Sequence, residues 1–196
     1  DDQVVHRARD YTQYNGWSLW DTYRTKFPLL TLAAPDRMAD MMESLVRSLE
    51  QRMSLAPDDR FPDLRGFLPC PTVRMELANV VLLDAHRKGI LTRDPRAAFQ
   101  VMKETALRHF PPESGAPDWV PGRPDLTCEY AYDSWAAACM AELLDQKDTA
   151  AFFYKRGRFY HNVWDDEIRF FRGRDAAGNW LDFPEDPAAI EEKHVY

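Results

Sequence analysis

The sequence predicts an all-α fold of antiparallel helix pairs, with a short β-hairpin near the C-terminus. Six segments of about fifteen residues repeat apolar side chains at helical spacing. Tight and long connections alternate between these segments, which is typical of antiparallel pairs. Since no sequence repeat of fixed period is present, a stacked solenoid and a toroid of two concentric helix rings fit this pattern equally well.

The first part of the chain begins with a polar stretch over residues 1–15, which we expect to be extended. A helix should follow over about residues 18–32, and Pro28 should bend it or end it early because proline lacks an N–H donor. The next helix starts at Pro35. Its apolar residues recur at spacings of three, four and seven: Met38, Met41, Met42, Leu45, Val46, Leu49 and Met53. Such a methionine-rich stripe is typical of a core, and residues 56–71 form a long loop rich in proline.

The middle of the chain carries clear start and stop signals. A third helix is expected over about residues 73–88, and Gly89 stops it because glycine tolerates the left-handed conformation of a C-terminal cap. Asp94 followed by proline is a strong signal for the start of a fourth helix, which runs to about His109. A second proline-rich loop covers residues 111–124.

Two further helices are expected in the last third of the chain. The fifth covers about residues 127–144, with Asp125 or Thr127 as its cap. The sixth begins at Asp148 or the next residue and runs to about Val163. One of its faces is mostly aromatic: Phe152, Phe153, Arg156, Phe159, Tyr160 and Val163.

Beyond the sixth helix the spacing of apolar residues changes to that of strands. Residues 168–172, followed by a glycine-containing turn at residues 175–179, predict the β-hairpin. The acidic tail from residue 182 should be loop with one helical turn.

Composition excludes several classes of function. The net charge is −7, and no run of Lys and Arg exceeds two residues, whereas nucleic-acid binding needs clustered positive charge. No apolar run approaches the roughly 18 residues of a membrane span. The three cysteines show no metal-binding spacing and make no disulfide framework. The chain begins without Met or a signal peptide, so we expect a piece of a longer polypeptide.

A cluster of aromatic and charged side chains near the N-terminus suits sugar binding. In a helix, Trp20, Tyr23 and Arg24 share one face, and Asp21 lies within reach of Arg24. An indole ring stacks on the C–H face of a sugar, while the carboxylate and the guanidinium hold hydroxyl groups. The alternative is a structural ion pair at the start of a buried helix.

The fifth helix offers two carboxyl groups on one face, Glu129 and Asp133, at spacing i,i+4. Inverting hydrolysis of a glycosidic bond needs two carboxyls about 6.5–9.5 Å apart. Tyr130, Tyr132 and Trp135 surround this pair in sequence, and apolar surroundings raise a carboxyl pKa, as a general acid requires. The alternative is acidic residues favoured by the helix dipole in a first turn.

Other candidates are weaker. Trp119 and Trp135 serve either as stacking platforms or as core residues. The cluster Asp165-Asp166-Glu167 suits either calcium, which prefers oxygen ligands, or a solvated turn. The five histidines are scattered, without H-E-x-x-H spacing.

Three motifs together resemble the catalytic domain of glycoside hydrolase family 92, whose members are calcium-dependent exo-acting α-mannosidases. The first is Ser18-Leu19-Trp20-Asp21-Thr22-Tyr23-Arg24, followed by Phe27-Pro28-Leu29-Leu30-Thr31-Leu32 and Pro35. The second is Glu129-Tyr130-Ala131-Tyr132-Asp133-Ser134-Trp135. The third is Phe171-Arg172-Gly173-Arg174-Asp175 with Gly178-Asn179-Trp180. The motifs occur in the family's order and span roughly residues 11–183.

The resemblance implies about half of an (α/α)6 toroid, with residues 1–196 as a single partial catalytic domain. The family's N-terminal β-sandwich and the C-terminal part of the toroid would be absent. The implied activity is the removal of terminal α-linked mannose, α-1,2-linked in particular, from glycans by an inverting mechanism that depends on calcium. An extracellular or periplasmic location is implied as well. Partners would be the mannose-containing glycan and the missing domains of the same polypeptide, with no nucleic acid and no membrane span.

The resemblance also assigns roles to residues. Glu129 is the implied general acid, with Asp133 next in line. Trp20 and Asp21 line the subsite for the terminal sugar, and Arg24 holds Asp21 in place or touches substrate. We place Asp133 with the substrate-binding residues and expect the calcium ligands outside this chain, so no metal ligand is assigned here.

Some family features are missing, which keeps other interpretations open. Neither a Thr-Glu-Gly-Asn-type calcium segment nor the acidic motif that supplies the base occurs. The His that the family usually carries shortly after the Met at position 75 is missing as well, since Glu76-Leu77-Ala78-Asn79 stands there. We therefore expect the isolated 196-residue chain to be inactive. One alternative is another (α/α)6 glycosidase, such as a trehalase-like enzyme. A second is a non-catalytic helical module that binds glycans or proteins.

Overall fold

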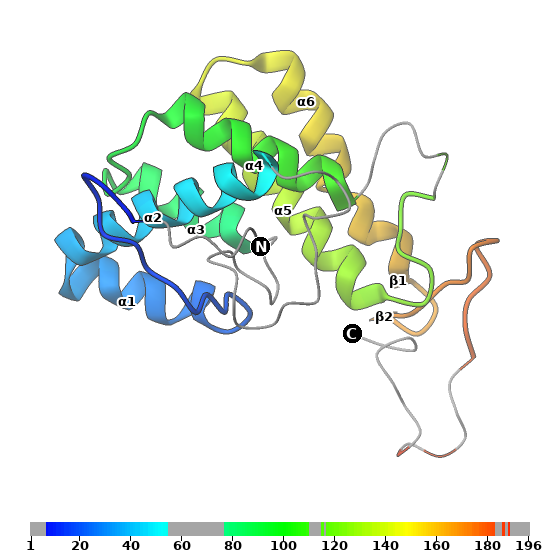
Figure 1. Cartoon of the computed structure of the whole chain (residues 1–196). Helices are drawn as coiled ribbons and strands as arrows, with labels where there is room; N and C mark the ends of the chain where they lie inside the picture. The colour runs from blue at the N-terminus through cyan, green and yellow to red at the C-terminus, as the bar shows by residue number, and fades with distance from the viewer. Residues whose placement is uncertain are drawn as a thin grey trace. The chain divides into compact units, whose positions relative to one another are not determined.

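The computed structural model describes residues 7–54, 77–109, 115, 117–182, 186 and 188. It divides into two compact units, Asp1–Thr105 and Ala106–Tyr196, which are described separately below. The described residues form six α-helices and one two-stranded antiparallel sheet near the C-terminus (Figure 1). The predicted all-α fold with a short hairpin is therefore confirmed, whereas the assignment of residues 1–196 to one domain stays a prediction.

The first unit contains a short 3-10 helix and three helices, and it shares a fourth with the next unit. The elements are η1 (Thr22–Arg24), α1 (Lys26–Ala33), α2 (Pro35–Ser54), α3 (Ala78–Arg87) and α4 (Pro95–His109). The methionine stripe of α2 faces the core as predicted. Its members Met38, Met42, Leu45, Val46 and Leu49 have no exposed surface. They pack against α1 and α3, which both contact α2.

The helix predicted over residues 18–32 is interrupted, and this part of the prediction was wrong. The 3-10 turn η1 ends before Thr25, whose φ of −126° and ψ of −72° are not helical, and α1 begins only at Lys26. Thr25 Oγ1 donates to the carbonyl of Asp21 at 2.8 Å, a local bond that competes with helix formation. Pro28 neither bends nor ends α1, because it lies in the first turn, where an N–H has no helical acceptor.

The next two helices follow the sequence signals closely. Gly89 lies just beyond α3 with a φ of +68°, so the predicted stop is confirmed. At the start of α4, Asp94 accepts a hydrogen bond from the N–H of Arg96 at 3.0 Å, as a capping side chain does. The predicted start of the third helix at residues 73–76 and the loop over residues 56–71 lie outside the described residues.

The second unit is built on one pair of helices. The elements are α5 (Pro124–Leu143), α6 (Lys147–Arg156), η3 (Phe159–Val163), β1 (Trp164–Asp165) and β2 (Phe170–Phe171). A three-residue connection over residues 144–146 folds α6 back along α5, so the two helices are antiparallel neighbours in Figure 1. The helix η3 also packs against α5. Small residues make this packing possible, since Ala136, Ala137 and Ala138 of α5 have no exposed surface.

Two helix boundaries in this unit differ from the prediction. The helix α5 begins at Pro124, three residues before the predicted start, and neither predicted cap acts as one. Asp125 is held by Arg123 instead, through contacts of 2.9 and 2.6 Å. Thr127 Oγ1 accepts from the N–H of Val120 and donates to the carbonyl of Arg123. The paired side chains therefore tie the start of α5 to the preceding loop.

The sixth helix ends at Arg156, seven residues before the predicted end at Val163. Gly157 follows it, and the backbone continues as the 3-10 helix η3. A Cβ atom at Gly157 would lie 3.1 Å from the Cβ of Trp135. The helices α6 and α5 therefore come into close contact at Gly157, and α6 ends just before it. The spacing of aromatic residues that predicted the longer helix continues beyond this point.

The strands form a different hairpin from the one predicted. Residues 170 and 171 pair with an earlier segment of the chain and not with residues after the predicted turn. Trp164 lies opposite Phe171, and Asp165 lies opposite Phe170. The predicted glycine turn at residues 175–179 exists, but a single bridge between Arg174 and Trp180 closes it. The prediction missed β1 because Trp164 and Asp165 directly follow a helical segment and are too few to show alternation.

Candidate active site

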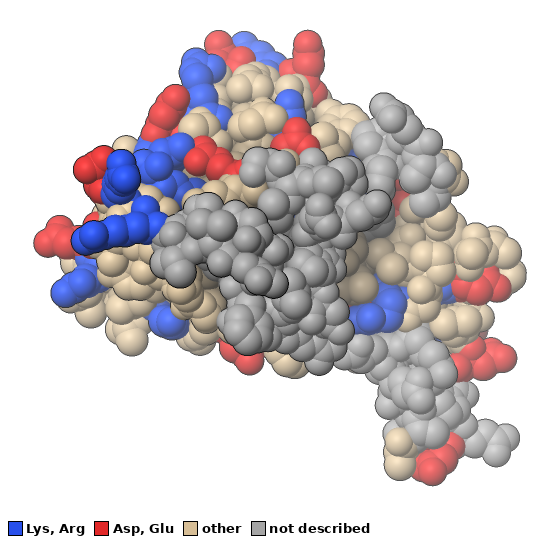
Figure 2. Space-filling view, in the orientation of Figure 1, with Lys and Arg blue, Asp and Glu red and all other residues tan. Residues whose placement is uncertain are grey.

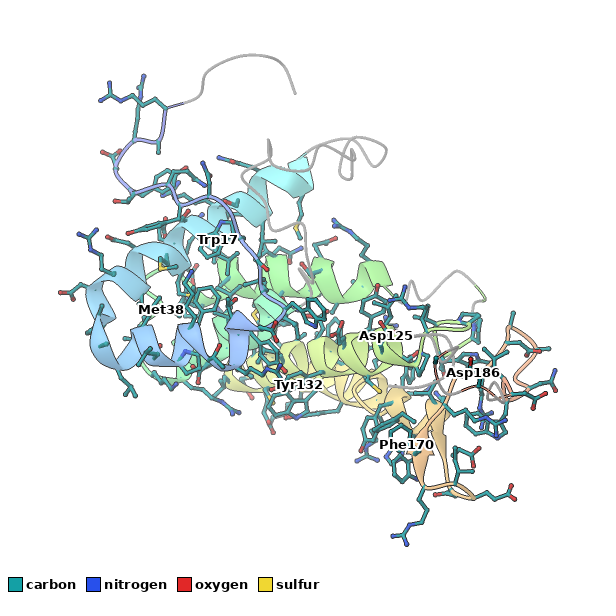
Figure 3. The ribbon with its side chains drawn as sticks, turned by 90° about the horizontal axis from the view of Figure 1, so that it is seen from below. Trp17, Met38, Asp125, Tyr132, Phe170 and Asp186 are labelled. Atoms are coloured by element: carbon teal, nitrogen blue, oxygen red, sulfur yellow. The ribbon has the colours of Figure 1, made fainter. Side chains whose placement is uncertain are left out.

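The carboxyl pair of the second motif lies on the buried face of α5. Glu129 is 6% exposed and Asp133 has no exposed surface. They are one helical turn apart and share a face, as predicted from their spacing. Tyr132 and Trp135 of the same motif are 39% and 36% exposed, and their rings stack with centroids 5.6 Å apart. Figure 3 labels Tyr132 on α5.

A buried cation accompanies this carboxyl pair. Arg156, the last residue of α6, is 5% exposed. Burial lowers the pKa of Arg156, while the negative charges of Asp118 and Asp133 act in the opposite direction and raise it. Two rings lie within cation–π range of this group, Phe152 at 5.3 Å and Phe159 at 5.8 Å. Sequence reasoning missed Arg156 as a site residue, although a lone arginine on an otherwise aromatic helix face is a usable signal.

The cysteine that precedes Glu129 in the sequence has a raised pKa. Burial raises the pKa of Cys128 to about 12, and the negative charges of Asp125 and Glu129 add to the effect. A thiol must lose its proton to react. Cys128 and Cys139 are unbridged, as the sequence predicted, and Cys70 lies outside the described residues.

The first motif lies at the surface of the first unit. Trp20 is 53% exposed. Arg24 Nη2 contacts Asp21 Oδ1 at 2.7 Å, and both side chains are mostly exposed. The predicted i,i+3 pair is therefore confirmed, although it forms around the turn η1 and not in a longer helix. Next to it, Leu19 is fully buried, so it holds this turn on the core.

The third motif forms a braced turn in the second unit. Arg172 donates from Nε to the carbonyl of Leu181 at 2.6 Å and from Nη1 to Asp165 at 3.2 Å. Asp175 Oδ1 accepts from the N–H groups of Ala177 and Asn179, both at 2.9 Å. These contacts are structural, and they hold the segment that follows β2 in a fixed conformation.

The tryptophans of this segment also have structural partners. Trp119 Nε1 donates to the carbonyl of Asp175 at 3.1 Å, and its ring lies under Gly178, where a Cβ would be 3.7 Å away. The guanidinium of Arg174 lies 3.7 Å from the ring centroid of Trp180. These contacts favour the core role over the stacking-platform role for Trp119.

The acidic cluster Asp165-Asp166-Glu167 does not fit calcium in this conformation. Asp165 Oδ1 accepts from the N–H groups of residues 167 and 168, and its other oxygen faces Arg172. Burial opposes the charge on Asp165, but these donors outweigh it and lower the pKa of Asp165. Among the residues that the structure describes, no group of three or more His, Cys, Asp or Glu side chains is placed to hold a metal.

The surface carries mixed charge. On the face shown in Figure 2, the described residues include both positive and negative side chains, and red ones lie among the blue ones at the upper left. No helix in the described part of the chain is long and apolar enough to cross a membrane.

Comparison with known proteins places these features in a family. The model of the glycosyl hydrolase family 92 catalytic domain matches residues 1–195. The solved structure of a family 92 α-mannosidase from Bacteroides thetaiotaomicron matches 97% of the chain, with 27% identity and a TM-score of 0.75. Its complex with mannoimidazole matches 92% of the chain, with the same identity and a TM-score of 0.72. No curated protein sequence matched the chain.

A third structure adds information on the fold alone. A family 92 inverting mannosidase of the same organism matches 90% of the chain, with 24% identity and a TM-score of 0.66. The chain spans 26%, 24% and 25% of the lengths of these three structures, respectively. The structural similarity confirms the predicted fold class, helix pairs of part of an (α/α)6 toroid. The chain belongs to the glycosyl hydrolase family 92 catalytic domain.

Proposed function

We propose that the full-length protein containing this chain is an exo-acting α-mannosidase that removes terminal α-linked mannose from glycans. Membership of family 92 supports the glycosidase activity. The complex of a 27% identical relative with mannoimidazole supports mannose as the sugar. The single observation in this chain that carries the proposal is the buried carboxyl pair of α5, Glu129 and Asp133, within the family motif.

Glu129 is the general acid in this proposal. Its side chain is nearly excluded from water, the type of environment in which enzymes keep a carboxylic acid protonated. Donation of that proton to the glycosidic oxygen lets the leaving sugar depart as a neutral alcohol. Such general acid catalysis contributes roughly 10²–10⁴-fold to the rate.

Sugar recognition is assigned to the exposed group of the first unit. The ring of Trp20 offers a flat apolar face, and Asp21 offers carboxylate oxygens that accept hydrogen bonds from sugar hydroxyls. Arg24 fixes the position of the Asp21 carboxylate through their 2.7 Å contact. Asp133 remains in the substrate-binding group as the second carboxyl of α5, although its burial restricts the atoms that it can offer.

The finer features of the proposed reaction concern residues beyond those described. We propose α-1,2 linkage specificity, inversion at the anomeric carbon and dependence on calcium. The described residues do not form a calcium site, so we assign the calcium ligands to other parts of the full-length protein. We assign the catalytic base there as well, and no step is derived through the metal. An extracellular or periplasmic location completes the proposal.

The test is hydrolysis by the purified full-length protein. We expect release of mannose from an aryl α-mannoside and from α-1,2-mannobiose, and no cleavage of trehalose. Proton NMR of the first product should show β-mannose if the reaction inverts. A chelator followed by added calcium tests the metal dependence. Cleavage of trehalose, or no cleavage of any α-mannoside in the presence of calcium, contradicts the proposal. The isolated 196-residue chain should show no turnover.

A further inference from the structure

One helix of the first unit exposes aliphatic side chains to solvent. Leu29 and Leu32 of α1 are 64% and 82% exposed, and Ala33 is exposed as well. At spacings of three and four residues, these positions share one side of the helix, called here the outer face of α1. A single exposed leucine is common on protein surfaces, but here three neighbouring positions form one apolar face.

The opposite side of α1 is already buried. Phe27 is 2% exposed and Thr31 is 8% exposed. The ring of Phe27 stacks on that of Trp17, with centroids 6.1 Å apart. The helix packs against η1 and against α2, which lies above it in Figure 1. A helix that is covered on one side only normally carries polar residues on the other side.

The composition of α1 does not suit a helix that faces water on one side. Among its eight residues, Lys26–Ala33, the only charged side chain is Lys26 at the start. A helix that is apolar on all sides is normally buried on all sides. The outer face also lacks the aromatic rings and hydrogen-bonding groups that recognise a sugar. Its side chains instead suit the apolar face of another helix.

The family comparison indicates which part of the protein supplies that helix. The α-mannosidase with 27% identity matches 97% of this chain, but the match covers only 26% of that relative. Most of the relative's polypeptide therefore lies outside the matched part. The described helices form part of an (α/α)6 toroid, and a helix beside the remaining part of a toroid gains its second neighbour from there.

We propose that the outer face of α1 is an internal interface of the longer protein, covered by an apolar helix of the same polypeptide from outside residues 1–196. Leucines three residues apart form a ridge that fits the groove of a second helix. This inference rests on the proposed function only in taking the chain as part of a longer protein. It does not depend on the proposed sugar or reaction.

Photo-crosslinking in the full-length protein identifies what covers this face. Leu32→benzoylphenylalanine places a photoreactive ring on the outer face, and Gln100→benzoylphenylalanine, at an exposed position of α4, is the control for chance reaction. After irradiation and digestion, mass spectrometry should find position 32 joined to a peptide from outside residues 1–196, in a product with the mass of one chain. Position 100 should give no such product.

Three outcomes of this experiment would overturn the inference. The first is a link from position 32 to a second copy of the protein, which doubles the mass on a denaturing gel. The second is a set of links confined to residues 1–196. The third is the absence of any link, which would mean that the outer face is free surface.

Thermal unfolding of full-length variants tests the same face without a probe. Leu32→Lys should lower Tm by about 4 °C or more, because an interface excludes water from the added charge. Leu32→Met keeps an apolar side chain of similar volume and should change Tm little. Gln100→Lys adds the same charge at an exposed position and should behave as wild type. An unchanged Tm in Leu32→Lys would contradict the inference.

The readouts keep this inference separate from the proposed function. If Leu32→Lys does not fold, the photo-crosslink at position 32 decides. Neither the crosslink nor Tm depends on catalysis, so an inactive wild-type protein would contradict the proposed function and leave the interface to be decided by the same two measurements.

Discussion

The first and second sequence motifs contain similar residue types, but their charged side chains differ in exposure to solvent. In the first, Trp20, Asp21 and Arg24 are all exposed around a short 3-10 turn. In the second, Glu129 and Asp133 are buried along one face of a long helix. A group that recognises a sugar must be reachable from water, whereas a proton donor benefits from exclusion of water. The contrast matches the two proposed roles.

The contrast also determines how well function and stability can be separated by mutation. An exposed ion pair such as Asp21–Arg24 contributes about 0–1 kcal/mol to stability, so its loss should be visible in binding and nearly silent in unfolding. The buried pair on α5 contributes to packing and to charge balance at once. Variants there need two substrates and a stability measurement before a role can be assigned.

The largest effect is expected for Glu129→Gln in the full-length protein. Glutamine keeps the size and most hydrogen bonds but cannot donate the acidic proton, so kcat for mannobiose should fall by about 10²–10⁴-fold. Ground-state contacts survive, so KM should change little. A dinitrophenyl α-mannoside should be largely spared. Steady-state kinetics with both substrates measures this difference.

Glu167→Gln provides the control for that experiment, because Glu167 is exposed and the substitution removes the same charge. It should leave both rates unchanged. If Glu129→Gln slows the two substrates equally, or only lowers Tm, Glu129 is structural and Asp133 becomes the next candidate for the acid.

The second prediction compares two tryptophans three residues apart. Trp17 is 7% exposed, its ring centroid lies 6.1 Å from that of Phe27, and its Nε1 donates to the carbonyl of Tyr14 at 3.1 Å. Figure 3 shows Trp17 beside the core of the first unit. Trp17→Ala should lower the unfolding free energy by about 3–5 kcal/mol, whereas Trp20→Ala should change it by about 0.5 kcal/mol or less. Denaturant unfolding measures both, and a similar loss in the two variants would contradict the separation of roles.

The sequence predicted most of the helices because local signals agreed with the final packing. The methionine stripe of α2 and the Asp94 cap of α4 depend on residues near each other in the chain, so periodicity and capping rules apply directly. Gly89 ends α3 for a local reason as well. Two predicted boundaries failed because side chains bond to nearby groups: Thr25 to the carbonyl of Asp21, and Thr127 to the loop before α5. A third failed because a distant contact decides it. The end of α6 at Arg156 depends on the approach of Gly157 to Trp135, which no local pattern reveals.

The candidate site was predictable to a similar extent. The shared face of Glu129 and Asp133 and the Asp21–Arg24 pair follow from helical spacing, and both geometries are present. Their roles in catalysis and binding stay predictions. Arg156 was missed because its burial arises from tertiary packing, where its guanidinium lies near the rings of Phe152 and Phe159 and its Nη2 reaches Ala106. The spacing of residues along the chain does not predict which helices pack together.

The third prediction sharpens the role of the exposed pair. Asp21→Ala should raise KM for mannobiose and for the dinitrophenyl α-mannoside by a similar factor of about ten, because a charged hydrogen bond of roughly 1.5–3 kcal/mol is lost from ground and transition states alike. Unfolding should hardly change. Asp36→Asn, at an exposed position in the first turn of α2, is the control. A fall in kcat limited to mannobiose would instead place Asp21 in the proton-transfer step.

The smallest expected effect concerns the stability of the third motif at acid pH. This motif is only partly exposed, and its contacts are structural. Hydrogen bonds from the side chain and N–H of Asn179, together with the N–H groups of Ala177 and Gly178, lower the pKa of Asp175. A carboxylate with a lowered folded-state pKa contributes stability that is present above its unfolded pKa of about 3.9 and is lost as pH falls through the folded value. Fluorescence of Trp119, whose indole bonds to Asp175, should therefore report loosening of this turn below about pH 4. Asp175→Asn should weaken the turn at neutral pH and flatten this acid transition. The control Asp148→Asn, at an exposed position, should leave the transition unchanged. If Asp175→Asn shows the same transition as the wild type, another carboxyl controls it.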